Sequence, residues 1–300
     1  IYLLGKEMVK KYKFNNVAIY SSLEDKKVVS IAKQVIEVLT SLGINCLLPQ
    51  SSKITQNLVN KGLSDNSIIK RSDLVIAIGG DGTLLSSARN FGIHGIPVLG
   101  INLGNLGFLT DIAPSNITAD LNRIMQGNYV EDKRIFLEAS IGSKGKKYKA
   151  LNEVVLHSGS IAQLIEYDLY FDNEFVYRQK ADGLIVSTST GSTAYSLSGN
   201  GPIISPDVKA ITLLPMFPHS LNSRTLITGQ EKEIKISVGT KSKAFLSMDS
   251  HLNLKVTSKD NVYIRKADRE LTLIHPTDHS FFSSCRTKLG WSLGVPSKKS

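Results

Sequence analysis

Residues 74–83 read LVIAIGGDGT, an apolar run that leads directly into a glycine-rich turn containing one carboxylate, Asp81. A continuous apolar run predicts a strand covered on both faces, as in a parallel sheet flanked by helices. Ligands of open α/β sheets bind at the carboxyl ends of the strands, so we expect a site at this turn. Glycines let a phosphate approach the backbone, and the N-terminus of a following helix favours negative charge. Gly80, Gly82 and Thr83 are therefore expected to shape a phosphate-binding turn.

Asp81 narrows the chemistry of this turn. A carboxylate about 4 Å from a phosphate charge is repelled by roughly 4 kcal/mol at an effective dielectric constant near 20. Either a divalent cation lies between the two anions, or the carboxylate faces a hydroxyl that attacks the phosphorus and accepts its proton. Both interpretations favour phosphoryl transfer. The alternative is that Asp81 only caps the helix, as Asp often does.

The chain around this turn predicts two domains. Up to Gly127, short apolar runs alternate with helical periodicity, which indicates an α/β domain with a Rossmann-like parallel sheet. Alternating strands then predict a domain rich in β-structure, resembling a β-sandwich, from residue 128 onward. Strands are expected at residues 17–20, 44–48, 74–78, 98–101, 137–141, 148–156, 164–171, 175–178, 211–214, 234–238, 244–248, 262–265 and 271–274, and helices at 28–42, 84–91 and 115–125.

Composition limits the class of protein. The net charge of +10 attracts polyanions, but its sign alone does not choose among nucleic acid, anionic lipid and a phosphate-rich small molecule. The lysine runs lack the interleaved aromatic residues of a nucleic-acid surface, so no nucleic-acid partner is predicted. Neither a secretory signal nor an apolar run of about 20 residues is present, which predicts a soluble, cytoplasmic protein without a membrane partner. Cys46 and Cys285 have no CxxC spacing and indicate neither disulfides nor a cysteine zinc site.

A hydroxyl-rich run gives the second signal. Residues 182–202 read DGLIVSTSTGSTAYSLSGNGP, and six of the seven residues from Ser187 to Thr193 carry a hydroxyl. Such a run supplies many donors and acceptors for a polar ligand, although a simple Ser/Thr-rich loop is the alternative. Asn152 and Glu153 add an amide and a carboxylate that could bind an adenine edge and a ribose diol.

Four motifs together resemble the NAD kinase family, of the bacterial type that uses ATP or polyphosphate. They are GGDGT at 79–83, GINLGNLGFL at 100–109, NE at 152–153 and the hydroxyl-rich run, in that family's order. The resemblance implies an N-terminal α/β domain at 1–127, a β-rich NAD-binding domain at 128–275 and a C-terminal segment at 276–300 that returns to the first domain. It also implies a divalent cation, Mg²⁺ above others, and a homo-oligomer, dimer or tetramer.

The resemblance assigns roles by position. Asp81 lies next to the reacting hydroxyl, and Asn152 and Glu153 hold the adenosine portion of NAD. The other substrate-binding residues that it implies are Gly80, Gly82, Thr83, Phe108, Lys180, Asp182, Thr190, Thr193, Ala194, Tyr195 and Ser198. No metal ligand is assigned.

The sequence also departs from the family's pattern. Lys180 stands where an Arg often precedes the DG pair, Ser189 where a Pro is usual, and Ser250-His251 where Gly-Gln is more common. The histidines, including His275 and His279, do not show the spacing of a ligand set.

The predicted reaction moves the terminal phosphoryl group of ATP, or of polyphosphate, to the 2′-hydroxyl of the adenosine ribose of NAD and gives NADP. One alternative is a lipid kinase, because diacylglycerol and sphingosine kinases share the GGDGT turn. Another is a non-catalytic nucleotide sensor or nucleic-acid binder that uses the positive charge.

Overall fold

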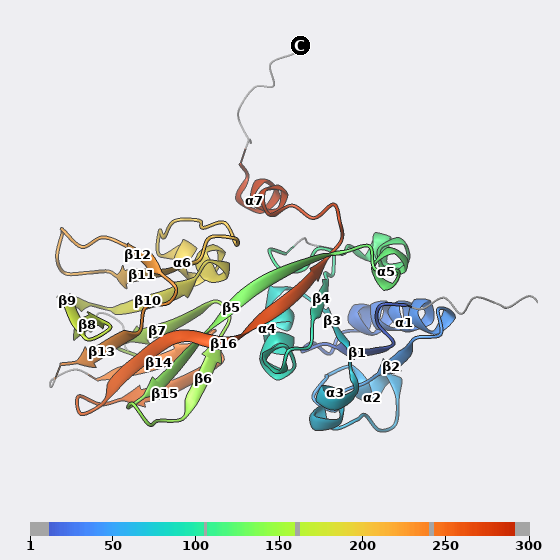
Figure 1. The fold of residues 1–300 in the computed structure, drawn as a ribbon, viewed down its shortest axis with the longest axis horizontal. Helices are drawn as coiled ribbons and strands as arrows, with labels where there is room; N and C mark the ends of the chain where they lie inside the picture. Colours follow the sequence, from blue (N-terminus) through green and yellow to red (C-terminus); the bar gives the residue numbers. More distant parts are fainter. Residues whose placement is uncertain (1–11, 105–106, 160–162, 240–242, 292–300) are drawn as a thin grey trace, which may run out of the picture. The chain divides into compact units, whose positions relative to one another are not determined.

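The structure is a computed structural model that describes residues 12–104, 107–159, 163–239 and 243–291. It divides into two compact units, of which the second is Lys133–Leu271 and the first contains the chain up to Asp132 and again from Thr272. Both divisions fall inside long strands, β5 (Val130–Ile141) and β16 (Asn261–His275), shown in Figure 1. The predicted divisions were at 127/128 and 275/276. Two parts of the predicted motifs and segments lie outside the described residues. They are Asn105 and Leu106 of the GINLGNLGFL motif and residues 292–300 of the C-terminal segment.

The first unit contains a parallel sheet. β1 (Asn16–Tyr20) pairs with β2 (Asn45–Leu47) and with β3 (Leu74–Ile78), and β3 pairs with β4 (Val98–Ile101), all in parallel. The end of β16 extends this sheet beside β4, also in parallel. Every residue of β3 is buried, as its continuous apolar run predicts. The predicted α/β class of this region is confirmed.

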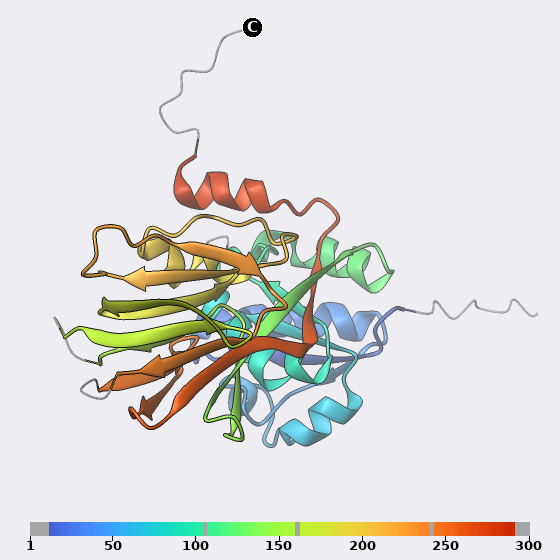
Figure 2. The ribbon, with the colours of Figure 1, turned by 60° about the vertical axis from the view of Figure 1, so that its left-hand side comes forward.

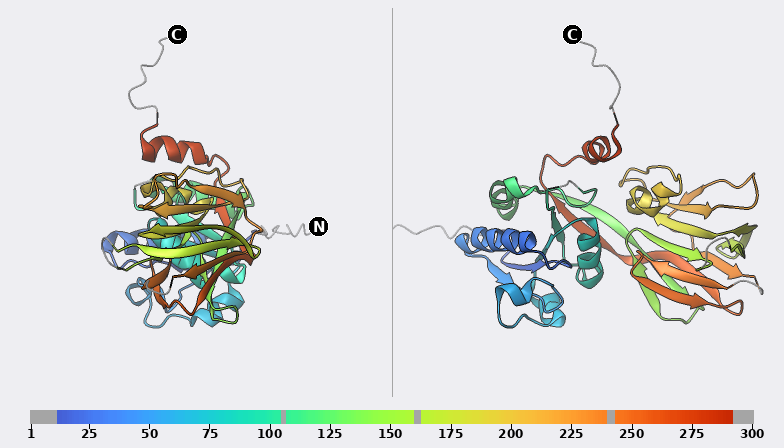
Figure 3. Two further views of the ribbon diagram at one scale, coloured as in Figure 1. Left: turned by 90° about the vertical axis from the view of Figure 1, so that its left-hand side faces the viewer. Right: turned by 180° about the vertical axis from the view of Figure 1, so that it is seen from behind.

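Helices cover both faces of this sheet (Figures 1 and 3). α1 (Lys26–Ser41) begins where the Asp25 side chain accepts a hydrogen bond from the Lys27 N–H, and Gly43, at φ +73°, follows its end. Its apolar face and that of α5 (Ile117–Met125) pack on the sheet in one hydrophobic cluster. α4 (Asp81–Asn90) lies on the opposite face. The remaining short helices of this unit are α2 (Thr55–Leu58), α3 (Asp65–Arg71), the 3₁₀ turns Gly92–His94 and Pro114–Asn116, and α7 (Phe281–Leu289).

The second unit is a two-sheet β-structure, which confirms the predicted β-rich class (Figure 2). One antiparallel sheet has the order β12-β11-β10-β7-β14-β15, and the other strands pair as β16-β13-β8-β9, with β5 pairing β16 and β6. Alternate side chains of both sheets form one buried cluster. The strands are β6 (Lys147–Ala150), β7 (Glu153–His157), β8 (Ile165–Phe171), β9 (Glu174–Ala181), β10 (Gly183–Thr188), β11 (Ala210–Met216), β12 (Leu226–Gly229), β13 (Ile234–Val238), β14 (Ala244–Met248) and β15 (Leu252–Val256).

Two strand predictions were wrong. The predicted strand at 148–156 is two strands, β6 and β7, which belong to different sheets. The chain changes sheet at Leu151 and Asn152, whose N–H groups donate to the Asp249 side chain instead of a neighbouring strand. Conversely, the strands predicted at 262–265 and 271–274 are parts of the single strand β16. No helix among the described residues is long and apolar enough to cross a membrane.

Candidate functional site

Asp81 is the first residue of α4, but its side chain does not cap that helix. The N-cap is Gly80, which has no side chain to cap with. Asp81 Oδ2 accepts a hydrogen bond from the Phe108 N–H and Oδ1 accepts one from the Leu109 N–H, both at 3.0 Å. The GGDGT turn and the end of the GINLGNLGFL motif, two separate stretches of sequence, therefore meet at one carboxylate.

The space around Asp81 depends on glycines. A Cβ on Gly107 would lie 2.2 Å from Asp81 Oδ1, so a larger residue would displace the carboxylate. Apart from the chain neighbours and the backbone of the helix itself, no atom of the described residues lies within 4 Å of a Cβ built on Gly80 or Gly82, which leaves the turn open on that side, as a bound phosphate requires. Thr83 differs from these glycines because it is buried and its hydroxyl shares a 2.8 Å hydrogen bond with Ser22 Oγ.

A cation that the sequence analysis did not identify lies beside Asp81. Lys288 of α7 places its Nζ 3.7 Å from Asp81 Oδ2 and 5.1 Å from the centroid of the Phe108 ring. Phe108 also contacts the Phe281 ring, at 6.5 Å between centroids. Lys288 lies in the last turn of α7, and its neighbours in the sequence form no motif that would distinguish it from a solvated surface lysine. Only the packing of α7 in the first unit reveals it.

In the second unit, Asp249 organises the Asn152-Glu153 pair. Its carboxylate accepts hydrogen bonds from the N–H groups of Leu151 at 2.8 Å, Asn152 at 2.9 Å and Glu153 at 3.2 Å. Asp249 and Ser250 have φ values of +41° and +56°, in the left-handed region that favours glycine. The family's usual Gly at position 250 therefore has a physical reason, and the sequence analysis noted this departure without recognising Asp249.

Asn152 and Glu153 are both buried, yet Asn152 Oδ1 and Glu153 Oε2 have no hydrogen-bond partner within the described parts of the chain. Burial, together with the charge of Asp249, raises the pKa of Glu153 to about 8, although a backbone N–H of Tyr195 opposes the shift. At neutral pH the Glu153 carboxyl is thus mostly protonated and can donate a hydrogen bond. Buried polar atoms without a partner are rare, and a bound water, ion or ligand is one explanation for them.

A cavity of about 530 Å³ in the second unit brings two predicted residues together, Asp182 and Tyr195. His157, Ser247 and Phe217 also line it. His157 Nε2 lies 3.1 Å from Ser247 Oγ, so both polar side chains are oriented toward each other. Cavities of this size with a few placed polar groups are typical small-molecule sites.

The other predicted residues are more dispersed. Thr190 is buried, and its hydroxyl accepts a 3.1 Å hydrogen bond from buried Arg134. Thr193 donates its hydroxyl to the Thr190 carbonyl. Lys180 is exposed on β9 and forms an ion pair with Glu166 of β8 at 3.2 Å. Ala194 and Ser198 flank the short helix α6 (Tyr195–Ser198) at its two ends, and Ser198 is exposed.

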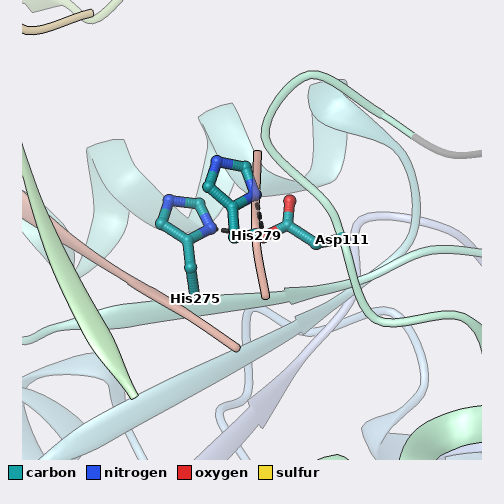
Figure 4. A group of neighbouring side chains, drawn as sticks. All are labelled: Asp111, His275 and His279. Atoms are coloured by element: carbon teal, nitrogen blue, oxygen red, sulfur yellow. Dashed lines mark hydrogen bonds and ion pairs between the residues drawn. The ribbon is translucent and has the colours of Figure 1, made fainter. Parts of the chain in front are cut away.

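The first unit contains a further cluster, Asp111, His275 and His279 (Figure 4). Nδ1 of His275 and Nδ1 of His279 both point to Asp111 Oδ2, the latter at 2.9 Å. Burial favours the neutral acid, but the hydrogen bonds and charges of the two histidines outweigh it and lower the pKa of Asp111 to about 2. These histidines were predicted to have no ligand role, because their partner Asp111 is distant in the chain.

Comparison with protein families matches both units. Residues 9–129 match the ATP-NAD kinase N-terminal domain, and residues 151–276 match the ATP-NAD kinase C-terminal domain. An NAD kinase of Marinobacter nauticus is 40% identical over 287 residues, which are 93% of this chain and 97% of that protein. An NAD kinase of Salmonella dublin is 45% identical over 227 residues, 74% of this chain and 78% of that protein.

Solved structures agree with this match. The yeast NADH kinase, crystallised with NADH, superposes with a TM-score of 0.83 at 27% identity, covering 95% of this chain and 90% of that one. An NAD kinase from Archaeoglobus fulgidus in complex with ATP has a TM-score of 0.72 at 22% identity and shares the fold, covering 91% of this chain and 99% of that one.

Proposed function

The chain belongs to the NAD kinase family, and we propose that it transfers the terminal phosphoryl group of ATP to the 2′-hydroxyl of the adenosine ribose of NAD. The observation that supports this step is the Asp81 carboxylate, which two backbone N–H groups hold at an open glycine turn. Those hydrogen bonds fix the carboxylate before any substrate arrives. A fixed acceptor of this kind orients a hydroxyl for attack.

In the proposed reaction, the ribose hydroxyl donates a hydrogen bond to Asp81. As the new oxygen–phosphorus bond forms, the bond between the terminal phosphorus and its bridging oxygen breaks, and that electron pair leaves with ADP. The hydroxyl proton moves to the Asp81 carboxylate. Since phosphoryl transfer has a loose transition state, the position of Asp81 matters more than its basicity.

The charges around Asp81 suit a polyanionic donor. Gly80 and Gly82 leave space for phosphate oxygens, with Thr83 fixing the turn from its buried side. Lys288 supplies a positive charge 3.7 Å from Asp81 Oδ2. We propose that Lys288 binds the phosphates of the donor. Without this positive charge, Asp81 would repel those phosphates by an energy of the order of 4 kcal/mol. Phe108 gives Lys288 an apolar surface to pack on.

Mg²⁺ is the proposed divalent cation. Carboxylate and phosphate oxygens are the ligands that it prefers, and it is usually held by one or two carboxylates together with substrate phosphates. Asp81 fits this description, because Oδ2 accepts one backbone hydrogen bond and keeps a further lone pair for an ion, while Oδ1 accepts from the Leu109 N–H and from the Thr110 hydroxyl. When bound, the ion would neutralise charge that develops on the donor.

NAD recognition is assigned to the second unit. The unpartnered oxygens of Asn152 and Glu153 are proposed to bind the adenosine portion, with the protonated Glu153 donating to a hydroxyl. Asp182 and Tyr195 both line the cavity of about 530 Å³ and are proposed to contact the dinucleotide there. Further contacts are proposed for Thr190, Thr193, Ala194, Ser198 and Lys180.

An assay of the purified protein tests the proposal. NAD and MgATP are incubated with the protein, and product is measured with an NADP-specific dehydrogenase, with parallel reactions that contain polyphosphate or NADH. NADP formation is expected, and no product with any donor would refute the proposed reaction. The lipid-kinase alternative is not favoured, because both units match NAD kinase models. The same preparation, measured by light scattering, tests the proposed homo-oligomer.

A further inference from the structure

Three side chains that can bind a metal ion lie close together in the first unit. Asp111 follows the segment that holds Asp81, His275 ends β16, and His279 lies in the loop before α7. One ligand atom from each lies within 4.8 Å of the other two (Figure 4). Two imidazole nitrogens and one carboxylate oxygen are the ligands of Zn²⁺ and related transition metals, whereas Mg²⁺ prefers oxygen alone.

We propose that Asp111, His275 and His279 form a binding site for one divalent transition-metal ion of the Zn²⁺ type. Its protein ligands are Asp111 Oδ2 and the Nδ1 atoms of both histidines. Three protein ligands leave a fourth position for water. A cavity of about 170 Å³ lined by Asp111, His279 and Ser280 adjoins the cluster and has room for that water.

The surroundings of His275 support a metal-ligand role. Its side chain is almost completely buried, and its second ring nitrogen, Nε2, lies 3.6 Å from Asp132 Oδ2. A histidine that binds metal through one nitrogen almost always directs its other N–H to a carboxylate, a carbonyl or water. Asp132 is placed for this function. Asp111 Oδ1 is, within the described residues, buried without a hydrogen-bond partner.

Ion binding requires one local movement. The two imidazole rings are stacked, with centroids 4.0 Å apart and planes at 13°, and the Nδ1–H of each ring donates to Asp111 Oδ2. Tetrahedral bonds of 2.0–2.1 Å separate ligand atoms by about 3.3 Å, compared with 2.9 Å between His279 Nδ1 and Asp111 Oδ2. The ion would replace the ring protons while the His279 ring turns. Its side chain is 15% exposed and lies on a loop, which permits that turn.

A metal ion at this site would connect two segments that contribute to the surroundings of Asp81. Leu109, which donates to Asp81, is two residues before Asp111 in the same segment. His275 and His279 precede α7, which carries Lys288. A bound ion would therefore join the segment that holds Asp81 to the segment that carries Lys288.

The full chain, stripped of metal with a chelator and dialysed, is titrated with Zn²⁺ alone in competition with a chromophoric chelator. We expect one ion per chain, with a Kd of about 1 µM or below. His279→Gln should weaken binding by at least about 10- to 100-fold, the cost of losing even an outer-shell partner of a metal ligand, whereas the exposed His219→Gln, in the second unit, should bind like the wild type. Asp111→Asn provides a second ligand variant.

Two further measurements keep the test independent of enzyme activity. Co²⁺ titration should produce visible d–d bands in the wild type and in His219→Gln that are weakened or shifted in His279→Gln. Zn²⁺ should raise the Tm of the wild type but not of His279→Gln, and circular dichroism verifies that each variant is folded. Binding weaker than about 100 µM, or equal affinity in the two histidine variants, would overturn the proposed site. Because no substrate is used, either result leaves the proposed kinase reaction to its own assay.

Discussion

Lys288 Nζ lies 3.7 Å from Asp81 Oδ2, so a cation from the last helix of the chain is paired with the carboxylate of the glycine-rich turn. Both side chains are partly exposed, so the pair itself contributes little to stability. The pair instead affects substrate binding, because the positive charge of Lys288 attracts an anionic substrate that the negative charge of Asp81 repels.

Replacing Lys288 tests this charge. Lys288→Met keeps the side-chain length but removes the ammonium, and we expect kcat/KM for ATP to fall by about tenfold or more, because that ratio measures transition-state stabilisation. Lys288→Arg keeps the charge and should retain most of the rate. Initial rates at saturating NAD with varied ATP measure both. If the Met variant matches the wild type, Lys288 has no part in donor binding.

Asp81→Asn tests the acceptor of the hydroxyl proton. The change keeps the shape of the side chain but removes its charge and basicity. We expect kcat to fall by about 10²- to 10⁴-fold while the protein remains folded and binds NAD, as judged by circular dichroism and calorimetry. Wild-type turnover would exclude Asp81 from catalysis.

Gly107→Ala tests whether the position of Asp81 matters separately from its chemistry. The new Cβ would lie 2.2 Å from Asp81 Oδ1 and 2.3 Å from Thr110 Oγ1, so the carboxylate must shift. A misplacement of about 1 Å can reduce the rate by about 100-fold, and we expect a loss of that order in kcat. Gly229→Ala is the matched control, since no atom of the described residues beyond its chain neighbours lies within 4 Å of its Cβ. Equal rates in both variants would contradict the positional role.

The raised pKa of Glu153 predicts that the free energy of unfolding depends on pH. Its pKa is raised to about 8 from an ordinary 4.5, so the folded protein keeps a proton that the unfolded chain releases between these pH values. The resulting contribution to the free energy of unfolding is complete below pH 4.5 and is lost as the pH rises through 8.

Glu153→Gln mimics the neutral carboxyl and removes this titration. The difference in unfolding free energy between wild type and variant should change by up to about 1.4 kcal/mol per pH unit, measured by urea denaturation between about pH 5 and pH 8. A difference that does not vary with pH would show that Glu153 titrates normally.

Ser250→Gly addresses the strained turn after β14. A non-glycine residue in the left-handed region costs about 1–2 kcal/mol, and glycine loses about 0.5–1 kcal/mol through its greater freedom in the unfolded chain. We therefore expect the variant to be slightly more stable, by up to about 1.5 kcal/mol. Urea denaturation measures the change, and a loss of stability would show that the Ser250 side chain makes a favourable contact.

Some of the fold follows from local sequence. The strands at 74–78 and 98–101 were predicted with the bounds that the structure shows, because unbroken apolar runs between turns report burial on both faces. The pattern failed at 148–156, which was predicted as one strand but contains a change of sheet between β6 and β7. Local periodicity cannot detect that break, since the group that causes it, Asp249, is remote in sequence.

By itself, the sequence determined the two structural classes, the glycine-rich turn at a strand–helix junction, and the motifs of the NAD kinase family, which the comparisons confirm. Tertiary structure alone decided which amides hold Asp81, that Lys288 lies beside it, and that Asp111 meets two histidines. The physical reason is that periodicity and turn chemistry act between near neighbours in the chain. Hydrogen bonds and charges act through space, between residues that only the packed fold brings together.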